Sequence, residues 1–181
     1  MAEPKKKWIK IVAPKILNHV EVGETLCSDN KKVIGRVFEV NIGSLTNDLK
    51  RSYMKLKLRI NEIKGEQANT EVIGYDTVKA YIKKTIRKNR SKVEDSFIAE
   101  CKDKVKVRIK PLIVTRYKAK RSVLTGLRKK TREFLLENCK KLSFEQLVSF
   151  VINNKLQRDL RKVLKKIFPL AVSEIRMLVK I

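Results

Sequence analysis

Two segments of the sequence alternate basic and apolar residues with a period of two. In Met54–Glu62 (MKLKLRINE) the apolar positions are Leu56, Leu58 and Ile60, and Lys104–Lys110 (KVKVRIK) repeats the pattern. Successive side chains of an extended strand point to opposite faces of a sheet. Each segment therefore predicts a half-buried strand, with one face on a core and a row of cations on the other.

Further strand patterns occur along the chain, and short links separate most of them. They cover Val33–Ile42, Tyr53–Ile63, Ala68–Tyr75, Lys92–Cys101, Lys104–Thr115 and Val172–Ile181. Short links favour antiparallel pairing. The segment Trp8–Leu17 is also apolar, but Pro14 argues against a central strand there, because proline cannot donate to a sheet ladder.

Other segments have helical periodicity. Asp76 is a candidate N-cap for an amphipathic helix that reaches Arg90 and has an apolar residue at every fourth position. From about Ser122 the helical spacing continues, and Ser143 with Gln146 fits a capping box that opens the next helix.

The last helical pattern has a buried stripe from Phe144 to Ile167. Asn153 and Asn154 mark a candidate break in it, and Pro169 ends it. Strands first, then one interposed amphipathic helix and two C-terminal helices, are typical of an α+β fold.

The charge balance indicates the class of partner. The 181 residues contain 44 Lys and Arg against 19 Asp and Glu, a net charge of +25. Self-repulsion of this size needs a polyanion nearby, and nucleic acid is the first one to consider. Because 43% of residues are apolar and fall in periodic patterns, we expect a basic arm over residues 1–7 and a single folded domain over residues 8–181.

Cysteine usage and hydropathy indicate the cellular compartment of the protein. Cys27, Cys101 and Cys139 are odd in number and widely spaced, which indicates reduced thiols and neither a disulfide framework nor a zinc site. No apolar segment approaches the length of a membrane span. An anionic membrane surface is a competing polyanion, but the basic segments lack the apolar face of an interfacial helix. We expect a soluble, cytoplasmic protein with no membrane partner.

The basic residues gather in segments that lack acids. Twelve Lys or Arg and no Asp or Glu lie from Lys104 to Arg132, and acids are also absent from Lys79 through Val93. A single charge run is usually a solvated face, but such a face normally mixes signs, so several acid-poor segments favour polyanion binding. Tyr117 lies among these cations and could stack on a base. The predicted RNA-binding residues are Lys5, Lys6, Lys7, Lys55, Lys57, Arg59, Lys79, Lys83, Lys84, Arg87, Lys88, Arg90, Lys106, Arg108, Lys110, Arg116, Tyr117, Lys118, Lys120, Arg121, Arg128, Lys129, Lys130 and Arg132.

Residues for catalysis are scarce. The sequence has no glycine-rich phosphate loop and one histidine, His19, in a predicted loop. Glu94, Asp95 and nearby Asp103 leave a magnesium-dependent nuclease open. Adjacent strand residues point to opposite faces, however, so turn-forming or charge-balancing roles fit these acids better. We predict no catalytic residue, no cofactor, no metal and no small-molecule substrate.

Several segments occur in the order and spacing of one known family. They are Trp8, Ile11–Lys15 (IVAPK), Ile34–Val40 (IGRVFEV), Leu45–Asp48 (LTND), Thr70–Asp76 (TEVIGYD), Val107–Leu112 (VRIKPL), Phe144–Val148 (FEQLV) and Lys165–Leu170 (KKIFPL). Together they resemble the archaeal and eukaryotic small-subunit ribosomal proteins called eukaryotic-type S one, formerly S three A e. The likeness runs from about Trp8 to Arg176. Leu26–Lys32 and Ala171–Ser173 depart from the family pattern.

The resemblance implies more than the residues alone. It implies an antiparallel β-barrel-like core with packed helices, and a structural constituent of the small ribosomal subunit, on its platform near the messenger exit and the 3′ end of the small-subunit rRNA. The implied partners are that rRNA and neighbouring small-subunit ribosomal proteins. The chain resembles the short archaeal form, which lacks the long basic extensions of eukaryotic relatives. The alternative is a free-standing RNA-binding or ribosome assembly factor.

Overall fold

The computed structural model describes residues 6–181, apart from the side chains of residues 30 and 31. The chain divides into two compact units, Met1–Gly74 and Tyr75–Ile181, which are described separately. Lys5 and the rest of residues 1–5 of the predicted arm lie outside the described residues, and Lys7 already opens a strand. A single domain over residues 8–181 stays a prediction.

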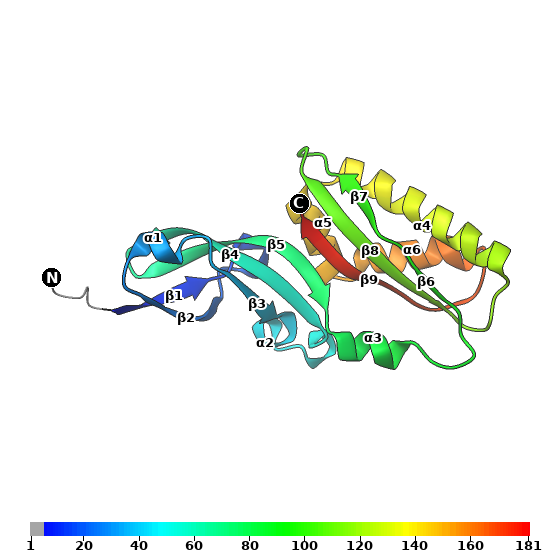
Figure 1. Cartoon of the computed structure of the whole chain (residues 1–181), viewed down its shortest axis with the longest axis horizontal. Helices are drawn as coiled ribbons and strands as arrows, with labels where there is room; N and C mark the ends of the chain where they lie inside the picture. Colours follow the sequence, from blue (N-terminus) through cyan, green and yellow to red (C-terminus); the bar gives the residue numbers. More distant parts are fainter. Residues whose placement is uncertain (1–5) are drawn as a thin grey trace. The chain divides into compact units, whose positions relative to one another are not determined.

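The first unit is a sheet with short helical links (Figure 1). Its described strands are β1 (Lys7–Val12), β2 (Glu21–Cys27), β3 (Val37–Asn41), β4 (Met54–Lys64) and most of β5 (Gln67–Thr77). They pair in the order β3-β4-β5-β1-β2, with β1 antiparallel to β2 and parallel to β5. The links contain η1 (Lys15–Leu17), α1 (Asn30–Val33), α2 (Ile42–Thr46) and η2 (Leu49–Arg51).

Strand β4 has the apolar face that its alternation predicts. Leu56, Leu58 and Ile60 are exposed by 1% or less. Ile60 packs with Ile9 of β1 and Ala68 of β5. Burial of each such leucine or isoleucine side chain contributes about 1.5–3 kcal/mol. A slip of one residue would expose the whole apolar set, so burial fixes the register of β4.

The prediction of one strand over Val33–Ile42 is wrong. Helix α1 ends at Val33, and β3 covers only the middle of the segment. The side chain of Asn41 then caps α2, because its Oδ1 accepts a hydrogen bond from the Gly43 amide at 2.9 Å. A capping asparagine satisfies a free amide of the first turn and so ends the strand where the helix begins.

The argument from Pro14 against a central strand is also wrong. Pro14 lies two residues beyond the end of β1, so it takes no place in the ladder, and β1 pairs on both edges. The parallel β1–β5 pair departs from the antiparallel expectation. Strand β2 was not predicted, because its sequence EVGETLC contains a glycine and is mostly exposed.

The second unit packs helices on a sheet centred on β8 (Figure 1). Strand β8 (Lys106–Thr115) pairs antiparallel with β9 (Leu170–Lys180) on one edge and with β6 (Lys92–Glu94) and β7 (Phe97–Glu100) on the other. The helices are α3 (Lys79–Thr85), α4 (Arg121–Lys141), α5 (Phe144–Ile152) and α6 (Lys155–Lys165).

The two faces of β8 have different neighbours. Ile113 packs in a hydrophobic cluster with Leu127 of α4 and Leu160 of α6. Leu112, which points to the opposite face, packs with Ile82 of α3. The sheet is therefore covered by α4 and α6 on one face and by α3 on part of the other.

The helix boundaries confirm two signals in the sequence. Ser143 Oγ accepts a hydrogen bond from the Gln146 amide at 3.3 Å, and Gln146 Oε1 accepts one from the Ser143 amide at 3.2 Å, so the capping box is formed. The break at Asn153 and Asn154 is also formed, since Asn154 has a φ of 56° between α5 and α6.

Two local predictions in this unit fail. Asp76 is not an N-cap: it lies in β5 and accepts a hydrogen bond from the Thr77 amide at 2.8 Å, whereas α3 begins at Lys79. The segment Lys92–Cys101 is not one strand either. The pairing with β8 lapses at Asp95 and Ser96, which separates β6 from β7, although both strands keep the same register against β8.

Taken by class, the strands and helices confirm the predicted α+β fold. In the first unit the described ladder is open, and it ends at β3 and β2. Barrel-like closure stays a prediction. No helix among residues 6–181 is both long and apolar enough to span a membrane.

Candidate nucleic-acid interface

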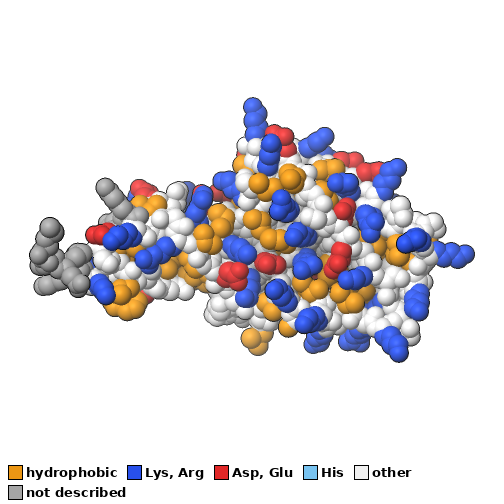
Figure 2. Space-filling model, in the orientation of Figure 1, with side chains coloured by type: hydrophobic (Ala, Val, Ile, Leu, Met, Phe, Trp, Pro, Cys, Tyr) orange, Lys and Arg blue, Asp and Glu red, His pale blue; other side chains and the backbone are white. Residues whose placement is uncertain are grey.

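Net charge is divided unequally between the two units. Residues 1–74 contain 14 Lys and Arg against 9 Asp and Glu, a net charge of +5, whereas residues 75–181 contain 30 against 10, a net charge of +20. Lys and Arg side chains also cover more of the face drawn in Figure 2 than Asp and Glu side chains do. A polyanion is therefore attracted mainly to the second unit.

The cationic face of β4 has its own counter-charges. Glu39 of β3 is the cross-strand partner of Lys57, and its carboxylate lies 3.4 Å from Lys57 Nζ and 3.3 Å from Lys55 Nζ. The hydrogen bond from Lys55 holds the pKa of Glu39 below its ordinary value. Arg59 forms an ion pair with Glu71 of β5. These three predicted RNA-binding residues therefore make cross-strand pairs.

Other cations of the first unit are paired in the same way. Lys10 Nζ lies 3.3 Å from Glu21 across the β1–β2 ladder, and Arg51 Nε lies 3.3 Å from Asp48. Exposed pairs of this kind add little stability. They do reduce the charge that this unit presents to a polyanion.

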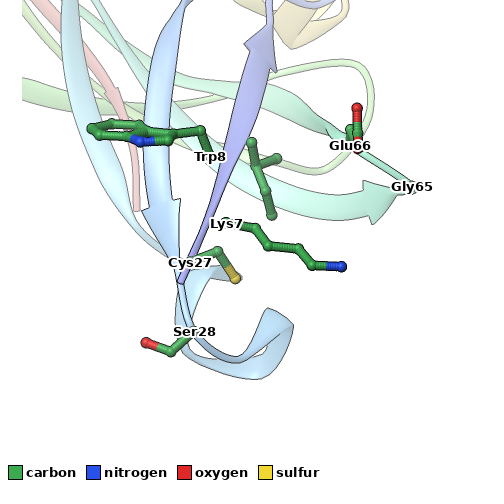
Figure 3. Close-up of a pocket in the computed structure, with 7 residues that line it drawn as sticks. Lys7, Trp8, Cys27, Ser28, Gly65 and Glu66 are labelled. Carbon is green, nitrogen blue, oxygen red and sulfur yellow. The ribbon is translucent and has the colours of Figure 1, made fainter. Parts of the chain in front are cut away.

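A cavity of about 400 Å³ lies beside the start of β1 (Figure 3). Figure 3 shows Lys7 and the Cys27 thiol on the side of Gly65 and Glu66, and Trp8 pointing away from them. One cation and one carboxylate line this cavity, so it has no excess of positive charge. Trp8 itself is 64% exposed. Lys6, also predicted to bind RNA, is exposed just before β1.

The loop between β8 and α4 is held by buried hydrogen bonds. The Thr115 hydroxyl is fully buried, accepts from the Ser91 amide at 2.9 Å and donates to the Tyr117 carbonyl at 2.6 Å. Ser91 Oγ accepts from the Ala119 amide at 3.1 Å. The backbone of this basic loop is thus fixed to the start of β6 and the end of β8.

The side chains of the same loop remain free of carboxylates. Tyr117 is 58% exposed, and the Arg116 guanidinium lies 5.7 Å from the centre of its ring. Arg116, Lys118 and Lys120 are exposed and form no ion pair within residues 6–181. An exposed aromatic ring beside unpaired cations can stack on a base while the cations neutralise phosphates.

Helix α4 continues this basic surface. Lys130 forms an ion pair with Glu133 at 3.2 Å, and the Arg132 guanidinium lies 5.3 Å from the centre of the Phe97 ring. The predicted cations of α4 that are exposed and form no ion pair in the described part of the chain are Arg121, Arg128, Lys129 and Arg132.

Strand β8 and the α3 region hold the remaining predicted residues. Lys106 and Arg108 are exposed and Lys110 is half-buried, and strand alternation puts all three on the face of β8 that α3 covers farther along. In the α3 region Arg90 is half-buried, and the exposed cations are Lys79, Lys83, Lys84, Arg87 and Lys88. None of these residues forms an ion pair within residues 6–181.

The structure adds a basic cavity that sequence reasoning missed. A cavity of about 400 Å³ is lined by five cations and two apolar residues: Arg116, Arg158, Arg161, Lys162, Lys165, Pro169 and Leu170. Of these cations only Arg116 was predicted. The apolar spacing from Phe144 onward predicts a buried stripe and says nothing of the opposite face. The signal that could have found the other four cations is their helical spacing on another face of α6.

The acids that could have supported a nuclease have structural roles. Glu94 lies 3.3 Å from Lys92 and 3.9 Å from Arg176, and Asp103 accepts a hydrogen bond from the Phe144 amide at 3.2 Å. No cluster of potential metal ligands is present among residues 6–181. Glu94 thus balances neighbouring positive charge, and Asp103 lies in a turn and binds the first amide of α5.

Several titratable groups of the chain are buried. All three cysteines are buried, and burial raises the pKa of Cys139 to about 12. Burial also raises the pKa of Glu174 to about 7, partly offset by Arg161. Its Oε2 atom has no hydrogen-bond partner among the described residues.

Comparison with known proteins identifies the family. The model of the Ribosomal S3Ae family matches residues 3–180. The chain is 36% identical to small ribosomal subunit protein eS1 of Nanoarchaeum equitans over 91% of its own length and 83% of that protein's. It is 34% identical to the protein of the same name in Methanobrevibacter smithii, over 94% and 88% of the two chains.

For the protein of the same name in Saccharolobus islandicus, the identity is 33%, over 94% of this chain and 82% of the other. These relatives are ribosomal proteins, which confirms the predictions of family resemblance and of a protein that is not an enzyme. The chain belongs to the Ribosomal S3Ae family.

Proposed function

We propose that the chain is a structural constituent of the small ribosomal subunit that binds small-subunit rRNA through the basic surface of its second unit. The observation that carries the proposal is the loop Arg116–Lys120, where cations without carboxylate partners surround an exposed tyrosine on a backbone fixed by Thr115 and Ser91. Family membership supplies the ribosomal setting.

The contacts go mainly to phosphates and 2′-hydroxyl groups. An A-form helix hides its major groove from side chains, and lysine and arginine need only charge and reach to bind its backbone. Tyr117 adds a stacking surface for one unpaired base. In this proposal the β4 cations contribute less, because Glu39 and Glu71 offset two of their three charges.

The proposed place is the platform of the subunit, near the messenger exit and the 3′ end of the rRNA, in the cytoplasm. Neighbouring small-subunit proteins are the other proposed partners. The support for this placement is family resemblance, together with a charge distribution that favours rRNA as the main contact.

Co-sedimentation tests the proposal. A tagged full-length chain should remain with purified small subunits, at one copy each, after a high-salt wash. A chain that leaves in the wash would be a visiting RNA-binding or assembly factor, which would overturn the structural role. Crosslinking of the retained chain should then recover small-subunit rRNA on residues of the Arg116–Lys120 loop rather than on β4.

A further inference from the structure

We propose that Arg116 and one face of α6 form a discrete pocket for two adjacent phosphate groups of an RNA strand. Its lining combines four cations of α6 with Arg116 at the end of β8 and an apolar wall of Pro169 and Leu170. The choice of RNA as the ligand rests on the proposed function. The affinity of the pocket for phosphate does not, and it can be measured without RNA.

The spacing of the helical cations is unfavourable unless an anion is bound. Arg158, Arg161, Lys162 and Lys165 are three or four positions apart, so they are neighbours on one face of α6. Like charges at these spacings weaken a helix. Among the described residues, one ion pair involves the four, from Lys162 to Asp159 at 3.1 Å, and Arg161 also faces the buried carboxyl group of Glu174. A doubly charged ligand would relieve the remaining repulsion.

Hydrogen bonds to the backbone hold two of the guanidinium groups in place. Arg161 Nη2 donates to the Leu170 carbonyl at 3.3 Å, and Arg158 Nη2 donates to the Asn153 carbonyl at 3.1 Å. Each guanidinium has five N–H donors, so most remain available to a ligand. Arg116 is anchored as well, since its amide donates to the Pro169 carbonyl at 3.0 Å.

The chemistry of the pocket lining favours a pair of phosphates over a carboxylate. Arginine forks match phosphate oxygens in a bidentate geometry, and five cations exceed what one carboxylate can balance. The cavity of about 400 Å³ has room for two phosphates with the sugar between them. Pro169 and Leu170 offer that sugar an apolar surface.

The direct test is calorimetric titration of the full-length chain with inorganic pyrophosphate. The double variant Arg116→Gln/Lys165→Gln removes two lining cations from different elements, and Lys165 has no ion pair within residues 6–181. The matched control Lys102→Gln/Lys166→Gln removes the same charge from exposed positions outside the pocket. We expect the first variant to lose roughly tenfold or more in affinity and the control about twofold or less.

Equal losses in the two variants, or no pyrophosphate binding by the wild-type chain, would overturn the pocket. Hydrogen exchange of the wild-type chain gives a second measurement that does not depend on how a variant folds. Pyrophosphate should slow exchange of α6 amides and leave α5 unchanged. Uniform slowing across the second unit would indicate charge screening alone and would count against a discrete site.

The RNA source is tested in intact small subunits by acylation of lysines. Lys165 should be protected relative to Lys166, and ribonuclease treatment should remove the difference. If Lys165 and Lys166 react equally before treatment, the pocket does not hold RNA, and a small phosphorylated anion is its ligand instead. This outcome would leave the structural role untouched, because that role is tested by co-sedimentation.

Discussion

The hydroxyl of Thr115 lies 2.6 Å from the carbonyl oxygen of Tyr117 and ties the end of β8 to the exposed loop that follows. The Thr115 hydroxyl oxygen also accepts a hydrogen bond from the Ser91 amide. One buried side chain therefore positions the proposed stacking residue and its flanking cations before any RNA arrives. Preorganisation of this kind lowers the entropy cost of binding.

Replacing Thr115 with valine should destabilise the protein and loosen the loop. The substitution nearly keeps the shape but leaves buried polar groups unpaired, at a cost of about 1–3 kcal/mol. The matched control is Thr125→Val, whose hydroxyl makes an exposed bond to the Arg121 carbonyl, and we expect about 0.5 kcal/mol or less there. Urea unfolding measures both. Equal stability of the two variants would show that the Thr115 bonds do not organise the loop.

Two triple glutamine variants should separate paired from unpaired cations. Removing Arg116, Lys118 and Lys120 should reduce the slope of log affinity for rRNA against log salt by roughly 0.7–0.9 per phosphate contact made. Removing the three β4 cations Lys55, Lys57 and Arg59 changes the net charge equally but should reduce the slope less, because carboxylates already pair with them. Filter binding of an rRNA fragment at several salt concentrations gives both slopes. A larger effect from β4 would reverse the assignment.

A substitution on the apolar face of β4 should lower the free energy of unfolding rather than the affinity for RNA. Leu58→Ala should cost about 2–5 kcal/mol of unfolding free energy through lost burial and a cavity, since Leu58 is fully buried. Val37 on the neighbouring β3 is 53% exposed, so Val37→Ala should have little effect. Denaturant melts at one salt concentration compare them. A Leu58→Ala chain as stable as Val37→Ala would contradict the assigned core.

Glu174 should make stability fall as pH rises from about 4.5 to 7. Its pKa is raised by burial to about 7 in the folded chain, from an ordinary value of 4.5, so the folded state keeps a proton that the unfolded state releases. Above pH 7 the cost should be constant, at roughly 2–3 kcal/mol or less. Glu174→Gln should therefore gain stability over the wild type across this window and no more above it.

The exposed Glu145→Gln provides the control for this pH dependence, because it removes a carboxylate that lies on the surface of the folded chain. Its stability curve should run parallel to that of the wild type. Thermal melts between pH 4 and pH 8 measure all three proteins. If the Glu174→Gln curve also ran parallel to the wild type, the buried carboxyl would not be the group that titrates.

The cysteines should resist alkylation in the folded protein. Burial raises the pKa of both Cys101 and Cys139, the latter to about 12, and the thiolate is the reactive form. Iodoacetamide at pH 8 should modify them slowly before unfolding and rapidly in denaturant, as read by mass spectrometry. Fast labelling of Cys139 in the native chain would show that α4 opens more readily than its packing suggests.

Periodicity predicted the elements whose local pattern agrees with their packing. The alternation of β4 and β8 and the Ser143–Gln146 capping box each encode their structure within a few residues. Strand β2 has no such pattern, and α2 depends on a side-chain cap at Asn41 that interrupts an otherwise apolar segment.

The candidate interface was harder to predict than the fold, for a reason visible in β4. The partners of its cations are Glu39 and Glu71, which come from other strands and meet them only through register. The basic residues of the β4 sequence, taken alone, therefore overestimate the number of cations that lack a carboxylate partner. They also missed the basic cavity, because Arg116 and Lys165 are brought together only by the path of the chain through Pro169.

The unequal charge of the two units has a consequence for the kinetics of assembly. With a net charge of +20 against +5, long-range attraction acts chiefly on residues 75–181, so these should make the first encounter with RNA. Salt should then slow association through the second unit, whereas contacts of the nearly balanced first unit should act mainly on the rate of dissociation. Charge placement of this kind should set the order of contact during assembly, with residues 75–181 first and residues 1–74 second.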